Sequence, residues 1–113
     1  MERGFTKKDN KLARELISVA VEREFEIGLG KAGEIISQWQ NKDIAVRDAY
    51  YKLFEHIKSF DKQISKRYDA LKNSDFPLVI SVLLNEKIIS EEEISDFSED
   101  AKIYIKLWIQ NLK

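Results

Sequence analysis

Hydrophobic residues recur every three or four positions through the first forty residues of the chain. They form one stripe, made of Ile17, Val21, Phe25, Leu29, Ala32, Ile36 and Trp39. This spacing predicts a helix over residues 7–40. Thr6 is placed to cap its start, and Asp9 follows three residues later as in a capping box. A second, partial stripe widens the apolar face, so we expect this helix to contact more than one neighbour.

The next segment has the most regular pattern in the chain. Its apolar positions follow a heptad-like spacing and are Val46, Tyr50, Leu53, Ile57, Phe60, Ile64 and Leu71. The pattern predicts a second helix over residues 44–72. Asn41-Lys42-Asp43 is typical of a tight turn, with Asp43 as the expected N-cap. The two long helices are therefore expected to be antiparallel.

Three short helices are predicted after residue 73. Pro77 fits the first turn of one helix, and the residues from Leu78 to Leu84 are almost all apolar, so we expect that helix to be buried. A single turn follows Ser90, and Ser98 is expected to cap a last helix that ends near Leu112. The predicted fold is all-α: one domain over residues 1–113, built as a helical bundle. It consists of a long antiparallel two-helix hairpin (7–40 and 44–72) and a C-terminal cap of short helices (76–112).

Composition narrows the possible classes. The 113 residues include 19 Lys and Arg against 20 Asp and Glu, and 43% are hydrophobic, which excludes a polybasic protein and a charged disordered tail. The chain has no cysteine, so disulfides and thiolate chemistry are excluded. The charged N-terminus does not resemble a signal peptide, and the longest apolar run is too short to span a bilayer. We expect a cytoplasmic protein without a membrane partner.

The segment Gly28-Leu29-Gly30-Lys31-Ala32-Gly33 matches the G-x-G-x-x-G pattern of dinucleotide-binding proteins. That pattern needs a preceding hydrophobic strand, and the residues before Gly28 are instead charged and spaced as in a helix. Nucleotide binding is therefore not expected. We expect the glycines to face the segment from Tyr50 to Phe54, where small residues leave room for bulky rings.

His56 is the only histidine, and it lacks the neighbouring ligands of a helical metal site. We expect it to be a partly buried structural residue, with no metal, no cofactor and no catalytic residue in the chain. The alternative is a pocket near Gly28–Gly33 that binds a small ligand or performs catalysis. Its lining would be Tyr50, Tyr51, Phe54 and His56.

Arg67 occupies the only non-apolar position of the second helix's seam. A charge there destabilises the fold unless it is paired, and antiparallel pairing predicts that Arg67 lies near Glu15 rather than Glu24. The alternative is that Arg67 joins Lys58, Lys62 and Lys66 in binding an anion or a phosphate. The charge balance of the hairpin region gives weak support to anion binding, because residues 1–72 include 15 basic and 12 acidic residues.

The predicted short helices are too short to cover the whole hairpin, so part of its apolar face should stay open. The simplest cover is a second copy of the chain. We therefore expect a non-catalytic protein that acts through protein–protein contact, as a homodimer through the long hairpin or with another helical protein. The two alternatives are weak nucleic-acid or anion binding by the basic face of the second helix, and the small-ligand pocket. Nucleic acid is not an expected partner.

Overall fold

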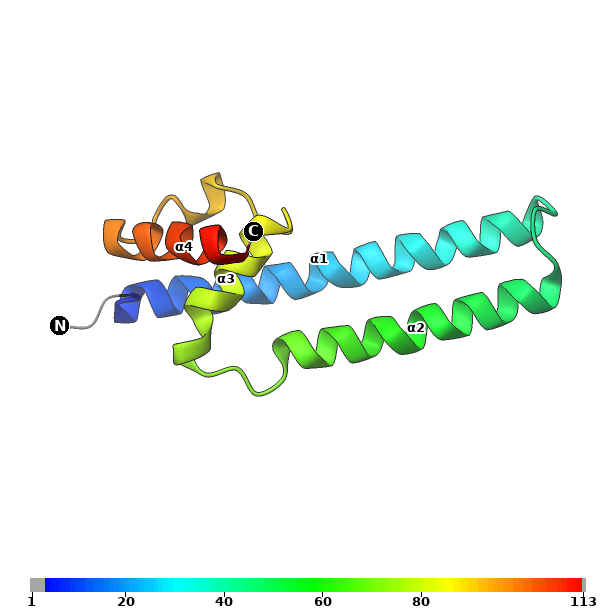
Figure 1. Ribbon diagram of the computed structural model, residues 1–113, viewed down its shortest axis with the longest axis horizontal. Helices are drawn as coiled ribbons and strands as arrows, with labels where there is room; N and C mark the ends of the chain where they lie inside the picture. Colours follow the sequence, from blue (N-terminus) through cyan, green and yellow to red (C-terminus); the bar gives the residue numbers. More distant parts are fainter. Residues whose placement is uncertain (1–3, 113) are drawn as a thin grey trace. The chain divides into compact units, whose positions relative to one another are not determined.

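The computed structural model describes residues 4–112, and within that range the regular structure is entirely helical (Figure 1). The four α-helices are α1 (Lys7–Gln40), α2 (Val46–Tyr68), α3 (Phe76–Asn85) and α4 (Glu99–Leu112). Two 3₁₀ turns, Asn73–Asp75 and Glu92–Ile94, precede α3 and α4. The all-α prediction of a long hairpin followed by short helices is confirmed.

Helix α1 begins and ends where its sequence predicts. The backbone N–H of Thr6 donates to Asp9 Oδ2 at 2.9 Å, and the N–H of Asp9 donates to Thr6 Oγ1 at 3.1 Å, which completes a capping box. The helix is continuous through its three glycines. It ends in a Schellman motif in which Lys42 is left-handed, with φ 64°, and the N–H of Asp43 donates to the carbonyl of Gln38.

Helix α2 is shorter than predicted at both ends. Residues 41–43 belong to the Schellman motif, and Ile44 and Ala45 separate them from the first residue of α2. Ala45 is the N-cap residue, in an extended conformation, and the predicted cap by Asp43 is wrong. The helix ends at Tyr68, because Ala70 is left-handed with φ 59°.

The described chain divides into two compact units, and the boundary lies inside α1. The first unit holds the residues up to Val21 together with those from Ala70 onward. The second unit is Glu22–Asp69. The N-terminal turns of α1 therefore belong with the short helices, and only the remainder of α1 belongs with the hairpin. The sequence-based assignment of one domain stays a prediction.

The first unit has a well-filled hydrophobic core. Helix α3 packs against α4, and both contribute side chains with no solvent exposure, among them Ile80, Leu83 and Ile105. Five residues from Val79 to Leu84 are buried as predicted, although Leu78 is exposed. The Ser98 hydroxyl accepts a hydrogen bond from the N–H of Ala101 at 3.2 Å, which confirms the predicted cap of α4.

The second unit is a hairpin in which α2 runs antiparallel beside the C-terminal half of α1 (Figure 1). Its core is thin: the buried hydrophobic side chains among its residues are Ala32, Ile35, Ala49 and Ile64. Many apolar residues of the two predicted stripes remain exposed on this hairpin. Two antiparallel helices can cover only one side of each other, so a third or fourth helix is needed to complete such a core.

Candidate protein interaction surface

Gly28 of α1 lies directly against the Phe60 ring of α2. A Cβ atom at this position would lie 2.6 Å from the Phe60 ring, so only glycine fits without displacing that ring. The Nε2–H of His56 donates to the carbonyl oxygen of Gly28 at 2.9 Å, and the imidazole also contacts Phe60, with ring centroids 5.8 Å apart. His56 is thus partly buried, as predicted, and its imidazole is held by the backbone of α1.

The predicted register of the glycines is wrong. Gly28 faces His56 and Phe60 rather than the segment from Tyr50 to Phe54, while Gly30 and Gly33 have no neighbouring atoms within reach of a Cβ. The loop between the helices is longer than the predicted three-residue turn. The two extra loop residues move the position on α2 that faces a given residue of α1 by about two residues.

The partner of Arg67 also differs from the prediction. Its Nη1 lies 2.6 Å from Oε1 of Glu24, and the predicted proximity to Glu15 is wrong. Glu24 is only 5% exposed. The buried carboxylate is compensated by the guanidinium, so the pair satisfies the requirement that a charge inside the hairpin must be matched.

Tyr68 completes this polar cluster by donating its hydroxyl hydrogen to Oε2 of Glu24. Burial raises the pKa of Tyr68, and the hydrogen bond to the carboxylate and the negative charge of Glu24 raise it further. Both oxygens of Glu24 therefore have a strong donor. The cluster is saturated by contacts within the hairpin, which fits a structural role.

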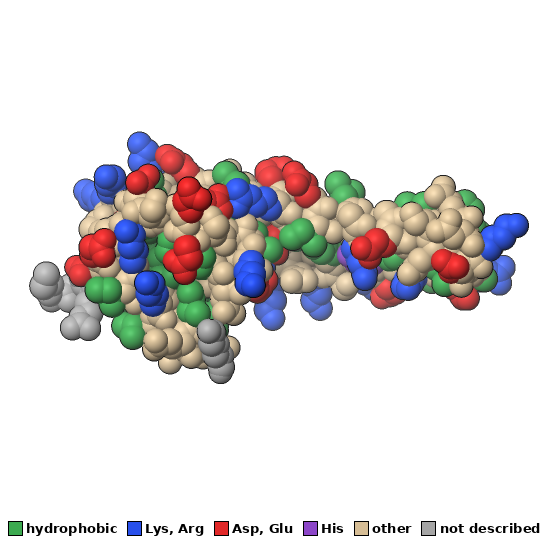
Figure 2. Space-filling model, turned by 90° about the horizontal axis from the view of Figure 1, so that it is seen from above, with side chains coloured by type: hydrophobic (Ala, Val, Ile, Leu, Met, Phe, Trp, Pro, Cys, Tyr) green, Lys and Arg blue, Asp and Glu red, His purple; other side chains and the backbone are tan. Residues whose placement is uncertain are grey.

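One side of the hairpin carries a continuous set of exposed hydrophobic side chains, which we call the open face. The set consists of Phe25, Leu29, Ile36 and Trp39 on α1 and Val46, Tyr50 and Ile57 on α2. Leu29 is 69% exposed and Tyr50 is 65% exposed. Hydrophobic and charged side chains both reach the surface along this part of the chain (Figure 2).

Two apolar hollows show that both stripes face the same side. One hollow, of about 230 Å³, is lined by Ile35, Ile36, Trp39, Val46, Ala49, Tyr50 and Leu53. The other, of about 120 Å³, is lined by Phe25, Gly28, Leu29, Ile57, Phe60 and Asp61. Members of one stripe on each helix line both hollows, so the hollows open on a single side of the hairpin.

The four residues of the predicted pocket are not gathered into one site. Tyr50 lines the larger hollow, and Tyr51 contacts the Tyr50 ring edge-on with centroids 5.5 Å apart. Phe54 is exposed on the neighbouring edge of α2, whereas His56 points toward Gly28. The small-ligand hypothesis stays a prediction, with the larger hollow as the place where it would apply.

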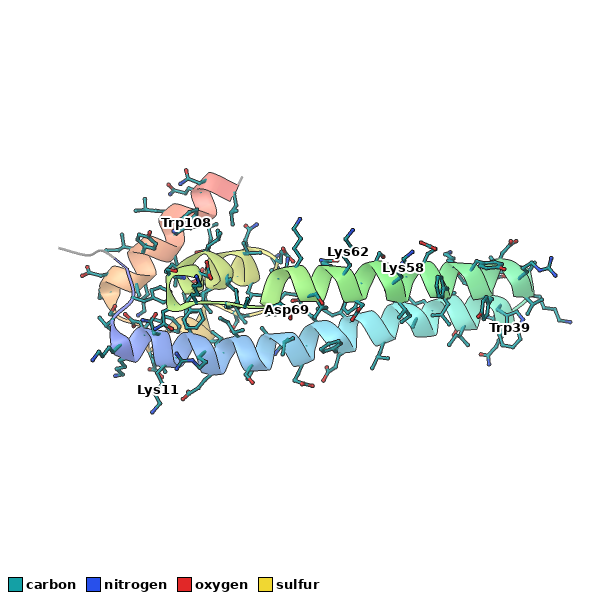
Figure 3. The ribbon with its side chains drawn as sticks, turned by 90° about the horizontal axis from the view of Figure 1, so that it is seen from below. Lys11, Trp39, Lys58, Lys62, Asp69 and Trp108 are labelled. Atoms are coloured by element: carbon teal, nitrogen blue, oxygen red, sulfur yellow. The ribbon has the colours of Figure 1, made fainter. Side chains whose placement is uncertain are left out.

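The predicted lysine row lies on a different part of α2. Lys58 and Lys62 project from the edge of α2 that points away from α1, while Trp39 lies at the loop end of α1 (Figure 3). Lys66 is also exposed, but Arg67 is turned inward to Glu24. The structure therefore separates Arg67 from the three lysines with which it was grouped.

Among residues 4–112, no three His, Cys, Asp or Glu side chains are grouped closely enough to hold a metal ion. In the same range, no helix combines the length and the apolar character that crossing a membrane requires. No family model matches the chain, and neither a curated protein nor a solved structure shows significant similarity to it.

Sequence reasoning found the two stripes but missed which of their members would be exposed. Spacing shows that residues share a face, but it does not show whether another helix covers that face. It also missed the pairing of Gly28 with His56, for which the only signal was a glycine and a histidine on adjacent predicted helices.

Proposed function

We propose that this chain is a non-catalytic helical protein that acts through protein–protein contact, and that it forms a homodimer through the open face of its hairpin. The observation that carries this proposal is the exposure of seven large hydrophobic side chains on one side of Glu22–Asp69. A contiguous exposed apolar surface of this kind is typical of interaction sites in folded proteins.

A second hairpin fits this surface better than a small ligand does. The hollows are shallow, apolar and distributed along both helices, so they match the side chains of another amphipathic helix pair. Packing two such hairpins face to face would give a four-helix arrangement with a filled core. Burying one large hydrophobic side chain contributes roughly 1.5–3 kcal/mol, so a set of this size can support association.

The test compares Leu29→Glu with Ile27→Glu by light scattering coupled to size exclusion at micromolar concentration. Both positions are exposed residues of α1, at 69% and 56%, but Ile27 lies two positions from Leu29 and hence on the other side of the helix. We expect about twice the 13.2 kDa monomer mass for the natural chain and for Ile27→Glu. We expect the monomer mass for Leu29→Glu, because a charge would be placed inside the interface.

A monomer mass for the natural chain at these concentrations would refute the proposal. Dissociation of the dimer by Ile27→Glu but not by Leu29→Glu would place the interface on another surface. Because both residues are exposed in the single chain, both variants should keep the helical circular dichroism of the natural protein.

A further inference from the structure

Three residues form a row along the edge of the open face. The charge pattern of this row is complementary to the same row in an antiparallel second copy. Arg47, Phe54 and Asp61 are spaced by seven residues on α2, so they lie almost one above another along the helix. Asp61 lines the smaller hollow, and Arg47 is exposed about 100° around the helix from Val46, at the outer rim of the open face. The positive Arg47 and the negative Asp61 are thus equally far along the helix from the Phe54 ring.

We propose that two copies associate through the open face with their hairpin loops at opposite ends, α2 packing against α2 and α1 against α1. This inference rests on the proposed function and specifies its partner and geometry. A twofold axis at Phe54 places the two Phe54 rings together. It also places Arg47 of each copy opposite Asp61 of the other, because both lie seven residues from the axis.

The register of the hairpin shows where the same axis crosses α1. Lys52 donates to Gln38 and Gly28 lies against Phe60, so residues 34 and 35 of α1 lie about level with Phe54. An axis at that level brings Trp39 of each copy close to Leu29 of the other, so the exposed apolar residues of α1 meet. The two Arg47–Asp61 pairs then flank an apolar centre.

The alternative arrangement of the two hairpins places both loops at the same end. It separates Arg47 from Asp61 of the second copy by about the length of fourteen helical residues, or roughly 21 Å. Asp61 would then face the apolar stripe of α1 of the second copy, where a carboxylate has no compensating charge. The charge pattern therefore selects the antiparallel arrangement, since opposed charges set register and orientation in helical pairs.

Charge reversal in two chains tests this geometry. In Arg47→Asp, position 47 and Asp61 are both negative, and in Asp61→Arg both positions are positive. Each variant alone should therefore dimerise more weakly, with a Kd raised about tenfold, because both pairs of positions 47 and 61 become repulsive. Mixed in equal amounts, the two variants should form a heterodimer with near-natural affinity, because both pairs again join opposite charges.

Lys62→Asp is the matched control, because it makes the same charge change on the edge of α2 that points away from α1. It should leave the Kd unchanged in sedimentation equilibrium. An equal mixture of Arg47→Asp and Asp61→Arg that dissociates as readily as either variant alone would overturn the antiparallel arrangement.

Cross-linking gives a second measurement that does not depend on charge. The natural chain has no cysteine, so Phe54→Cys and Asp43→Cys each supply a single thiol for a short bis-maleimide. We expect rapid covalent dimers for Phe54→Cys. Little linkage is expected for Asp43→Cys, whose two copies would lie roughly 30 Å apart along the helix axis.

Efficient linkage through position 43 but not through position 54 would overturn the inference and indicate adjacent loops. Failure of both positions to link while the mass remains dimeric would also overturn it, and the proposed dimer would stand. A monomer mass for the natural chain would refute the proposed function itself, so the two failures are distinguishable.

Discussion

The carboxylate of Asp9 accepts two hydrogen bonds from Ser98, from its backbone N–H at 2.8 Å and from its hydroxyl at 2.6 Å. These residues are 89 positions apart, and each also caps a helix: Asp9 completes the capping box of α1, while Ser98 caps α4. Asp9 is only 1% exposed. One buried carboxylate therefore joins the beginnings of the first and last helices within one unit.

Replacing Asp9 with Asn should destabilise the protein by about 2 kcal/mol, because the Ser98 donors lose a charged acceptor. The measurement is urea unfolding at pH 7, followed by circular dichroism. Asp43→Asn is the control, since Asp43 is exposed and does not cap α2, and it should change the free energy of unfolding by less than about 0.5 kcal/mol. Equal midpoints for the natural chain and Asp9→Asn would contradict this role.

The same carboxylate should make stability depend on pH. Burial alone would raise the pKa of Asp9, but the hydrogen bonds from Ser98 and Thr6 outweigh it and lower the pKa. A lowered pKa in the folded state stabilises the protein fully above the ordinary aspartate pKa of about 3.9. The contribution is lost as the pH falls from there through the lowered folded value. Asp9→Asn should flatten this part of the profile of unfolding free energy against pH.

Removing the Arg67 side chain should leave the carboxylate of Glu24 buried without its cationic partner. We expect Arg67→Ala to lower the free energy of unfolding by about 3 kcal/mol, whereas Lys66→Ala, on the exposed side of α2, should cost less than about 0.5 kcal/mol. Replacing both Glu24 and Arg67 with Leu should cost less than Arg67→Ala. If Arg67→Ala unfolds at the same denaturant concentration as the natural chain, the structural role of the pair is wrong.

The glycines of α1 should respond differently to alanine. Gly30→Ala should stabilise the helix by roughly 0.5–1 kcal/mol, because a Cβ there has open space. Gly28→Ala should lose this gain, because its Cβ would displace the Phe60 ring and disturb the contacts of that ring with Phe25 and His56. Thermal unfolding would measure both variants, and equal stabilisation by the two alanines would show that Phe60 does not restrict Gly28.

The lysine row should not bind nucleic acid at physiological salt. Lys58, Lys62 and Lys66 are exposed, but Arg67 is bound to Glu24 and so does not extend the row. Fluorescence anisotropy with a short labelled single strand should give the same low signal for the natural chain and for a triple alanine variant. Binding that weakens steeply with salt and disappears in the triple variant would instead support the anion-binding alternative.

The amino-acid pattern determined much of this fold without any tertiary information. Period-3.6 spacing gave the limits of α1, and the Thr6–Asp9 and Ser98 caps followed from short-range preferences for backbone hydrogen bonding. The buried character of α3 also followed, because its residues are apolar on nearly every side. These features depend on neighbours within a few positions of the chain.

Only the tertiary structure decided the register of the hairpin. The left-handed Lys42 and the extended Ala45 lengthen the connection by two residues, and the packing of the two helices pairs Arg67 with Glu24 rather than Glu15 and places Gly28 against Phe60. The link from Asp9 to Ser98 was equally out of reach, and so was the identity of the stripe residues that remain exposed on the open face. The sequence determines which residues share a helix face, but which faces meet depends on connection geometry and on packing between distant segments.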